Sequence, residues 1–158
     1  MTKIELRVTE PSEAQAAAST MHDALNIPDR LWKLIADPQY ATYTAYAGDD
    51  PVAAAIVRWA DVSEIEVFAV DRCRRRQGLG QAVIAEIVRE AKKRGVCTIL
   101  VGTSSIALDN IMFYQKCGFR MYQVRRNYFA ESFPDLHVEW RGVVLRDMIV
   151  FAYDLTDD

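Results

Sequence analysis

The chain has 158 residues, of which 51% are hydrophobic and 26% are charged, and this is the size and composition of one ordinary globular domain. Its formal net charge of −3 argues against a nucleic-acid partner, because nucleic-acid-binding surfaces are usually broadly basic. No segment has the pattern of a signal peptide or the length of a membrane span, so we expect a cytoplasmic protein with no membrane partner.

The first third of the chain predicts one strand, two helices and a hairpin. Alternating apolar and polar residues predict a strand over 4–9, and good helix formers predict a helix over 12–25. A second, short helix is expected after Pro28. The segments 40–47 and 52–60 are rich in aromatic and β-branched residues and flank a Gly-Asp-Asp-Pro turn, so they predict an antiparallel hairpin.

The next segment, 64–70, predicts a strand with two different faces. One face carries Ile65, Val67 and Ala69, and the other carries Glu64, Glu66, Phe68 and Val70. Strands are also expected over 96–101, 119–124 and 148–155. Apolar residues at helical spacing predict helices over 80–94 and 108–116, whereas 125–146 reads as an irregular segment rich in aromatic and acidic residues. We therefore expect a single α/β domain over 1–158.

The segment Arg75–Gly80, with the sequence Arg-Arg-Gln-Gly-Leu-Gly, lies between a predicted strand and the start of a predicted helix. Glycines at 78 and 80 let the backbone approach a ligand, and the first turn of a helix offers free N–H groups to an anion such as a pyrophosphate. The alternative is a solvated basic turn. A Walker loop is excluded because Gly-Lys-Ser/Thr is missing, and the short Gly-x-Gly spacing disfavours a Rossmann fingerprint.

Two motifs together resemble the GNAT superfamily of acyl-CoA-dependent N-acetyltransferases. The first is the strand end Phe68-Ala69-Val70 followed by Arg75-Arg76-Gln77-Gly78-Leu79-Gly80, and the second is Phe113-Tyr114-Gln115-Lys116-Cys117-Gly118-Phe119. The resemblance covers nearly the whole chain. Within the family, the chain is similar to a small bacterial subgroup without an assigned substrate. The resemblance implies an α/β (α+β) fold with a mixed, mostly antiparallel sheet of about six to seven strands flanked by about four helices.

The resemblance also implies a cosubstrate, acetyl-CoA, and residues that bind it. Backbone amides of the loop would hold the CoA pyrophosphate, which assigns Arg75, Arg76, Gln77, Gly78, Leu79 and Gly80 to cofactor binding. The end of the preceding strand, Phe68, Ala69 and Val70, would pair with the pantetheine arm. Many members carry an asparagine seven positions before the tyrosine, but this chain has Ala107 there, so Ser104 or Ser105 is the substitute to consider.

Chemistry assigns two proton-transfer roles at such a site. A phenol near the sulfur can protonate the leaving CoA thiolate, and Tyr114 is the candidate acid, with simple core packing as the alternative. An amine must lose a proton to attack, so a base is needed near the strand that holds pantetheine. Glu66 is the first choice and Glu64 the second, acting directly or through water, and surface carboxylates are the alternative.

The cysteines and histidines predict no further chemistry. Cys73, Cys97 and Cys117 are odd in number and widely spaced, which fits neither a disulfide framework nor a zinc site. His22 and His137 lack a neighbour at metal-ligand spacing, so we expect no metal. A cysteine-borne acyl intermediate is disfavoured because direct attack needs none.

The acceptor is expected to be a small-molecule or peptide amine. In the GNAT arrangement it enters opposite CoA, beside the connection between the last two strands, and here that connection mixes aromatic walls with acidic residues. The alternative is that this segment packs on itself or on a second subunit, as in a homodimer. A second hypothesis for the whole chain is a CoA-binding module with weak catalysis, which acts as a sensor or an interaction domain.

Overall fold

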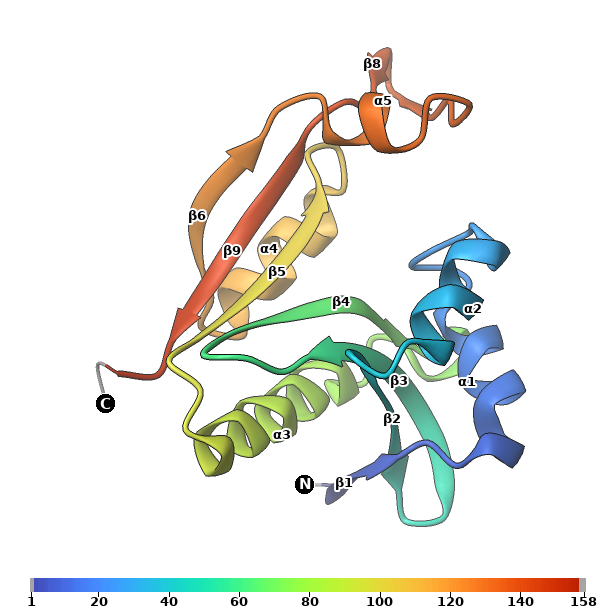
Figure 1. Cartoon of the computed structure of the whole chain (residues 1–158), viewed down its shortest axis with the longest axis vertical. Coiled ribbons are helices and arrows are strands. Elements are labelled where there is room, and N and C mark those ends of the chain that lie inside the picture. Colours follow the sequence, from blue (N-terminus) through green and yellow to red (C-terminus); the bar gives the residue numbers. More distant parts are fainter. Residues whose placement is uncertain (1, 157–158) are drawn as a thin grey trace.

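The computed structural model describes residues 2–156, and its centre is a seven-stranded sheet with the strand order β1-β2-β3-β4-β5-β9-β6 (Figure 1). The strands are β1 (Ile4–Val8), β2 (Ala41–Ala47), β3 (Asp50–Arg58), β4 (Val62–Val70), β5 (Thr98–Ser104), β6 (Arg120–Arg125), β7 (Glu139–Trp140), β8 (Val143–Val144) and β9 (Met148–Asp154). The helices are α1 (Ala14–Met21), α2 (Pro28–Ala36), α3 (Leu79–Arg94), α4 (Leu108–Lys116) and α5 (Tyr128–Ser132). Short 3₁₀ turns cover Pro11–Glu13 and Arg72–Arg74.

The expected fold class is confirmed: the sheet is mixed and mostly antiparallel. Every neighbouring pair of strands in it is antiparallel except β4 and β5, which are joined through α3 and run parallel. A parallel pair needs a long crossover, and the helix supplies it. The hairpin of β2 and β3 and helix α4 also lie where the residue pattern predicted them.

The parallel pair β4 and β5 is short, and this opens the middle of the sheet. The two strands pair only over Val62–Ile65 and Thr98–Val101. Beyond Ile65 the strands diverge, as Figure 1 shows between the green β4 and the yellow β5. The remaining half of β4 therefore has β3 on one side and no strand on the other.

Two hydrophobic clusters lie on the two faces of the sheet. One contains the buried side of α3, including Val83, Ile84 and Ile87, together with the ring of Tyr114 from α4. The other contains residues of α1 and α2, such as Met21. Burying side chains of this size stabilises a fold by about 1.5–3 kcal/mol each. The helices are thereby fixed on opposite faces of the opening between β4 and β5.

A β-bulge in β4 corrects the expected alternation of its side chains. Ile56 of β3 pairs with Val67 and the next residue, Val57, pairs with Ile65, so Glu66 is an extra residue without a partner in β3. Ile65 packs in the α3 cluster, whereas Val67 packs in the α1 and α2 cluster. The expectation that these two residues share a face is therefore wrong.

The bulge also changes the surroundings of the acidic residues of β4. Phe68 and Val70 pack against the α3 cluster, together with Ile65. Glu64 precedes Ile65 and so lies on the other face, opposite Arg58. The expected common face of the carboxylates with Phe68 and Val70 is corrected: the carboxylates lie on the face of α1 and α2.

The segment 125–146 is more ordered than its composition suggested. It contains the one-turn helix α5 and a two-stranded ribbon, β7 with β8, separate from the main sheet. Rings of Tyr128, Phe129 and Phe133 contact one another, with centroids 5.1 to 6.3 Å apart, and these contacts explain the order. In Figure 1 this segment lies at the top of the view, above α2, and the guanidinium of Arg30 in α2 lies 5.1 Å from the ring centre of Phe133.

Candidate active site

The loop before α3 is shaped to bind an anion. Arg76 and Gly78 adopt left-handed backbone conformations, with φ of 61° and 75°. The first helical hydrogen bond of α3 runs from the Ala82 N–H to the Gly78 carbonyl, so the preceding amides are not used within the helix. Free N–H groups and the positive end of the helix dipole meet here. This arrangement suits a pyrophosphate.

Gly80 holds the loop close to its surroundings. A Cβ atom at this position would lie 3.0 Å from a ring carbon of Phe113 and 3.4 Å from a methyl group of Val70. A side chain at residue 80 would therefore push the first turn of α3 away from Val70 of β4 and Phe113 of α4.

The arginines of this loop divide into anchors and a free one. Arg75 donates to the Val70 carbonyl at 3.1 Å and to Asp23 at 3.0 Å, and Arg72 also donates to Asp23, at 2.8 Å. Arg72 is also the main cause that lowers the pKa of Asp23. Arg76 is exposed and has no partner within residues 2–156. Its guanidinium is therefore available to a phosphate, whereas that of Arg75 is engaged in holding the loop.

The open half of β4 presents a backbone edge and an aromatic wall. Phe68, Ala69 and Val70 pair with β3, and their other edge faces the opening towards β5. Phe68 stacks on Phe113 with the ring centroids 6.0 Å apart and the planes at 10°. The edge offers backbone donors and acceptors to an extended ligand with amide groups.

Tyr114 is a buried phenol whose hydroxyl is unused by the protein. The residue is 7% exposed, and its ring lies 5.2 to 5.9 Å from the rings of Phe113, Phe119 and Phe151. The hydroxyl makes no hydrogen bond with any of the described residues. Burial raises the pKa of Tyr114, so the phenol keeps its proton and remains a donor.

The two glutamates of β4 have different surroundings. Glu64 contacts Arg125 at 3.5 Å and Arg58 at 3.8 Å. Glu66, at the bulge, has no hydrogen bond or ion pair within the described part of the chain. Its pKa is raised, first by burial and second by the charge of Glu64. A half-buried carboxyl with a raised pKa and no partner is better suited to accept a proton than an ion-paired one.

The polar side chains at the start of α4 have structural partners. Ala107 precedes α4, and the nearby Asn110 donates to the Thr103 hydroxyl on β5 at 3.3 Å. The Ser104 hydroxyl accepts a hydrogen bond from the Ile106 amide at 3.2 Å, which is the geometry of a turn residue. The Ser104 hydroxyl can still donate a hydrogen bond, and the Ser105 side chain makes none with the described residues, so replacement of the family asparagine by Ser104 or Ser105 stays a prediction.

The thiols are not paired with one another. All three cysteines are unpaired, and burial raises the pKa of Cys117 to about 11, which keeps that thiol protonated at neutral pH.

Among residues 2–156, no three side chains of the metal-binding types come together, and no helix is long and apolar enough to cross a membrane.

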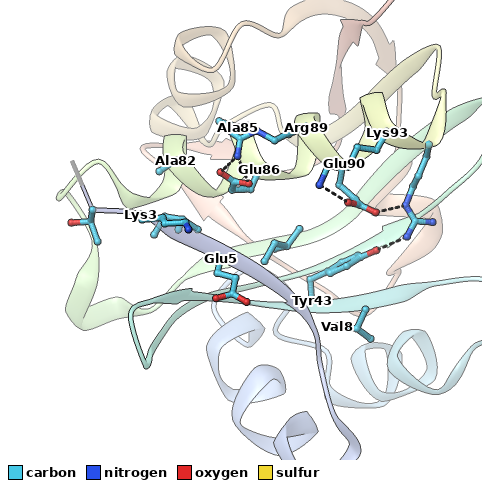
Figure 2. A pocket seen from close by; sticks show the side chains of 14 residues that line it. Lys3, Glu5, Val8, Tyr43, Ala82, Ala85, Glu86, Arg89, Glu90 and Lys93 are labelled. Atoms are coloured by element: carbon cyan, nitrogen blue, oxygen red, sulfur yellow. Dashed lines mark hydrogen bonds and ion pairs between the residues drawn. The ribbon is translucent and has the colours of Figure 1, made fainter.

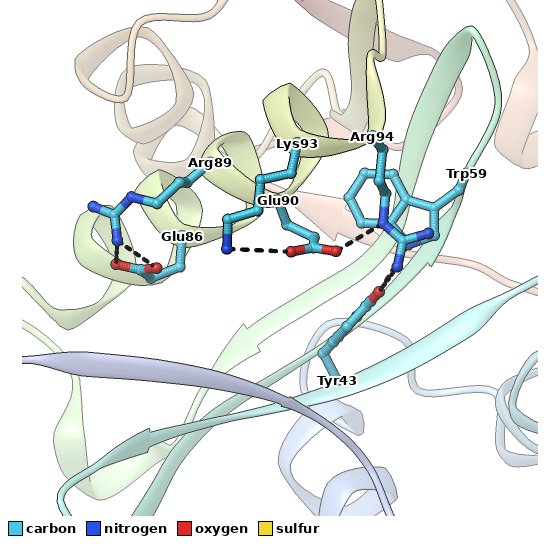
Figure 3. Close-up of polar contacts among 7 residues, drawn as sticks. All are labelled: Tyr43, Trp59, Glu86, Arg89, Glu90, Lys93 and Arg94. Carbon is cyan, nitrogen blue, oxygen red and sulfur yellow. Dashed lines mark hydrogen bonds and ion pairs between the residues drawn. The ribbon is translucent and has the colours of Figure 1, made fainter.

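A separate hollow of about 610 Å³ lies between β1 and α3 (Figure 2). Two arginines that line the hollow are paired with glutamates of the same helix: Arg89 donates to Glu86 at 2.6 Å, and Arg94 donates to Glu90 at 2.9 Å (Figure 3). Arg94 also lies over the ring of Trp59. None of the predicted site residues lines this hollow.

Several residues of the site were missed by sequence reasoning. Asp23 holds the loop before α3 through Arg72 and Arg75, and three arginines, Arg30, Arg58 and Arg125, surround the glutamates. These arginines come from three segments far apart in the sequence, and in the sequence each looks like an ordinary surface charge. Only the excess of basic over acidic residues in 120–126 was a local signal.

Comparison with known proteins identifies the arrangement. The model of the acetyltransferase (GNAT) family matches residues 6–119. The uncharacterized N-acetyltransferase YvbK of Bacillus subtilis is 30% identical over 115 residues, which are 72% of this chain and 74% of that protein. The [ribosomal protein bS18]-alanine N-acetyltransferase of Escherichia coli is 35% identical over 65 residues, 41% of this chain and 44% of that protein.

A solved structure agrees over nearly the full length. The crystal structure of a Bacillus subtilis acetyltransferase in complex with CoA has a TM-score of 0.83 and 26% identity, and the match covers 97% of this chain and 98% of that one. The chain therefore belongs to the acetyltransferase (GNAT) family and is an acetyl-CoA-dependent N-acetyltransferase.

Proposed function

We propose that the protein acetylates a primary amine by direct attack, with Tyr114 as the general acid and Glu66 as the base. The positions of two residues support this proposal: Glu66 lies in β4 directly after the stretch that pairs with β5, and Tyr114 lies in α4, the helix that follows β5. Neither side chain has a partner among residues 2–156, and burial raises the pKa of both. Tyr114 belongs to the core cluster of α3, and Glu66 lies on the face of α1 and α2. Donor and acceptor of protons thus lie on opposite faces of the sheet.

Residues that fit acetyl-CoA are grouped on one side of the opening. Backbone amides of Gln77–Gln81 and the guanidinium of Arg76 would hold the pyrophosphate, and the free edge of Phe68–Val70 would pair with the pantetheine amides. Bound there, the cosubstrate supplies an activated acetyl thioester. Arg75 supports this binding indirectly, because it fixes the loop to β4 and to Asp23.

The protein's own groups then move two protons. Glu66, directly or through water, takes a proton from the acceptor ammonium, and its raised pKa brings its basicity closer to that needed near neutral pH. Tyr114 gives its proton to the leaving thiolate, which a phenol kept neutral by burial can do. Glu64 is the second candidate for the base, but its contacts with two arginines hold it in place.

The experiment has a binding part and a turnover part. Calorimetry should show acetyl-CoA binding one to one and raising thermal stability, because the ligand binds only the folded chain. A panel of polyamines, amino acids, aminoglycosides and peptides is then assayed for CoA release. Binding without release on any amine would favour the catalytically weak CoA-binding module, and absence of binding would contradict both functions.

Cytoplasmic location and homodimer formation remain predictions.

A further inference from the structure

Three arginines surround the proposed acceptor side of the opening. Arg30 comes from α2, Arg58 from the end of β3 and Arg125 from the end of β6. All three act electrostatically on Glu66, and the last two also contact Glu64. Segments that are far apart in the sequence thus bring three cations to two carboxylates.

The hydrogen-bonding capacity of these arginines is largely unused. Arg58 reaches Glu64 only at 3.8 Å and Arg125 reaches it at 3.5 Å, which are long for charge-assisted hydrogen bonds. Arg30 makes no ion pair or hydrogen bond with the residues that the structure describes. Its guanidinium lies 5.1 Å from the ring centre of Phe133, and this contact joins α2 to α5.

The arginines of α3 that line the hollow beside β1 provide a comparison. Arg89 and Arg94 bond their glutamates at 2.6 and 2.9 Å, although they are more exposed, with side chains 62% and 43% accessible (Figure 3). Arg58 and Arg125 are only 34% and 31% accessible and yet lack short contacts. Partly desolvated cations with free donors favour an anionic ligand.

The glutamates do not neutralise the group. With both carboxylates ionised, three positive charges face two negative ones, and protonation of Glu66 increases the excess. A purely cationic acceptor such as a polyamine would meet Arg30 and Arg125 at the entrance. An acceptor with a carboxylate beside its amine would instead match both kinds of charge.

We propose, on the basis of the function proposed above, that the acceptor is an amine with a carboxylate close to it, such as a free α-amino acid. Arg30 binds the carboxylate, with Arg125 and Arg58 adding positive charge, while the amine faces Glu66. The guanidinium of Arg30 is held by the Phe133 ring and needs little reorganisation to form a bidentate pair. Arg30 is thereby a residue that determines specificity.

The test compares acceptors that differ in one group. L-amino acids, their carboxamides and short peptides with amino-terminal alanine are assayed for kcat/KM with acetyl-CoA. The carboxamide has the less basic amine, so intrinsic reactivity favours the amide, and a preference for the acid reports on recognition. We expect the acid to be preferred by about 10- to 100-fold, the effect of one charge-assisted pair.

Variants assign the preference to the arginine. Arg30→Gln should reduce the ratio of acid to amide towards one, and Arg30→Lys should restore part of it. Arg89→Gln is the matched control, because Arg89 lines the separate hollow beside β1 and pairs with Glu86, so the ratio should be unchanged. The salt dependence of KM for the acid should weaken in Arg30→Gln.

The outcomes separate this inference from the function on which it rests. Equal kcat/KM for acid and amide, or a preference for the amide or the peptide, would overturn the inference while leaving the acetyltransfer intact. An unchanged ratio in Arg30→Gln would overturn the assignment to Arg30. If no amine is acetylated although acetyl-CoA binds, the proposed function fails, and the inference fails with it.

Discussion

Replacing Tyr114 with phenylalanine separates its proton-donating role from its packing role. The ring is buried among three other aromatic rings, and phenylalanine fills the same space. Because the hydroxyl has no partner among residues 2–156 and is not among their fully buried polar atoms, its removal breaks no hydrogen bond within the protein. The free energy of unfolding should therefore change by less than about 1 kcal/mol, which is less than about 2–4 °C in Tm for a domain of this size.

The activity should fall although the stability is kept. Loss of one positioned acid typically lowers turnover by about 10²- to 10⁴-fold, and the affinity for acetyl-CoA should hardly change. Calorimetry gives the affinity, thermal unfolding gives Tm, and a thiol-release assay gives kcat. Full activity of Tyr114→Phe on a confirmed acceptor would refute the acid role. A large fall in Tm would instead show that the hydroxyl has a structural partner, contrary to its surroundings described above.

Other predictions concern the base, the loop and its anchor. Because burial raises the pKa of Glu66, the native state keeps this proton to a higher pH than the unfolded state does, and stability is lost as pH rises through the native pKa. Glu66→Gln should therefore stabilise the protein near pH 8 and not near pH 4, and denaturant unfolding at the two pH values measures this difference. In the same variant activity should fall most at low pH, and an equal loss at every pH would indicate acceptor positioning instead. Gly80→Val should abolish acetyl-CoA binding in calorimetry because its side chain meets Phe113, and normal binding would show that the loop is only a turn. Asp23→Asn should weaken acetyl-CoA binding without changing kcat at saturation, and an unaltered Kd would show that the loop holds its shape without this anchor.

The elements of the fold follow from local sequence signals, and for this reason they could be predicted. The Gly-Asp-Asp-Pro turn defines the β2–β3 hairpin, and the stop after Lys116 defines the end of α4. The loop Arg75–Gly80 could also be predicted, because a glycine-containing segment between a predicted strand and a predicted helix is itself a local signal. The limits of β4 and α3 differ from the predicted ones by only one or two residues.

The arrangement of the site depends on long-range contacts that the sequence does not encode locally. The stretch Ile65-Glu66-Val67 reads as ordinary alternation of apolar and polar residues, so nothing in the sequence marks Glu66 as the bulge. The extra residue shows only when the pairing with β3 is known. Arg30 likewise gains its role from Phe133, about a hundred positions away in the chain. The order of 125–146 was missed because it rests on ring contacts rather than on regular spacing.

The short pairing of β4 with β5 has a consequence for the motions of the protein. Only four residue pairs join the half with β1 to β4 to the half with β5, β9 and β6, so among the described residues this seam is the shortest run of strand pairing within the seven-stranded sheet. We expect the two halves to open separately in native-state hydrogen exchange, and a ligand bonded along the free edge of β4 to join them into one cooperative unit. Saturating CoA should then slow exchange in β5 and β9, which lie beyond the binding loop, and the same exchange rates with and without ligand would show that the seam is already rigid.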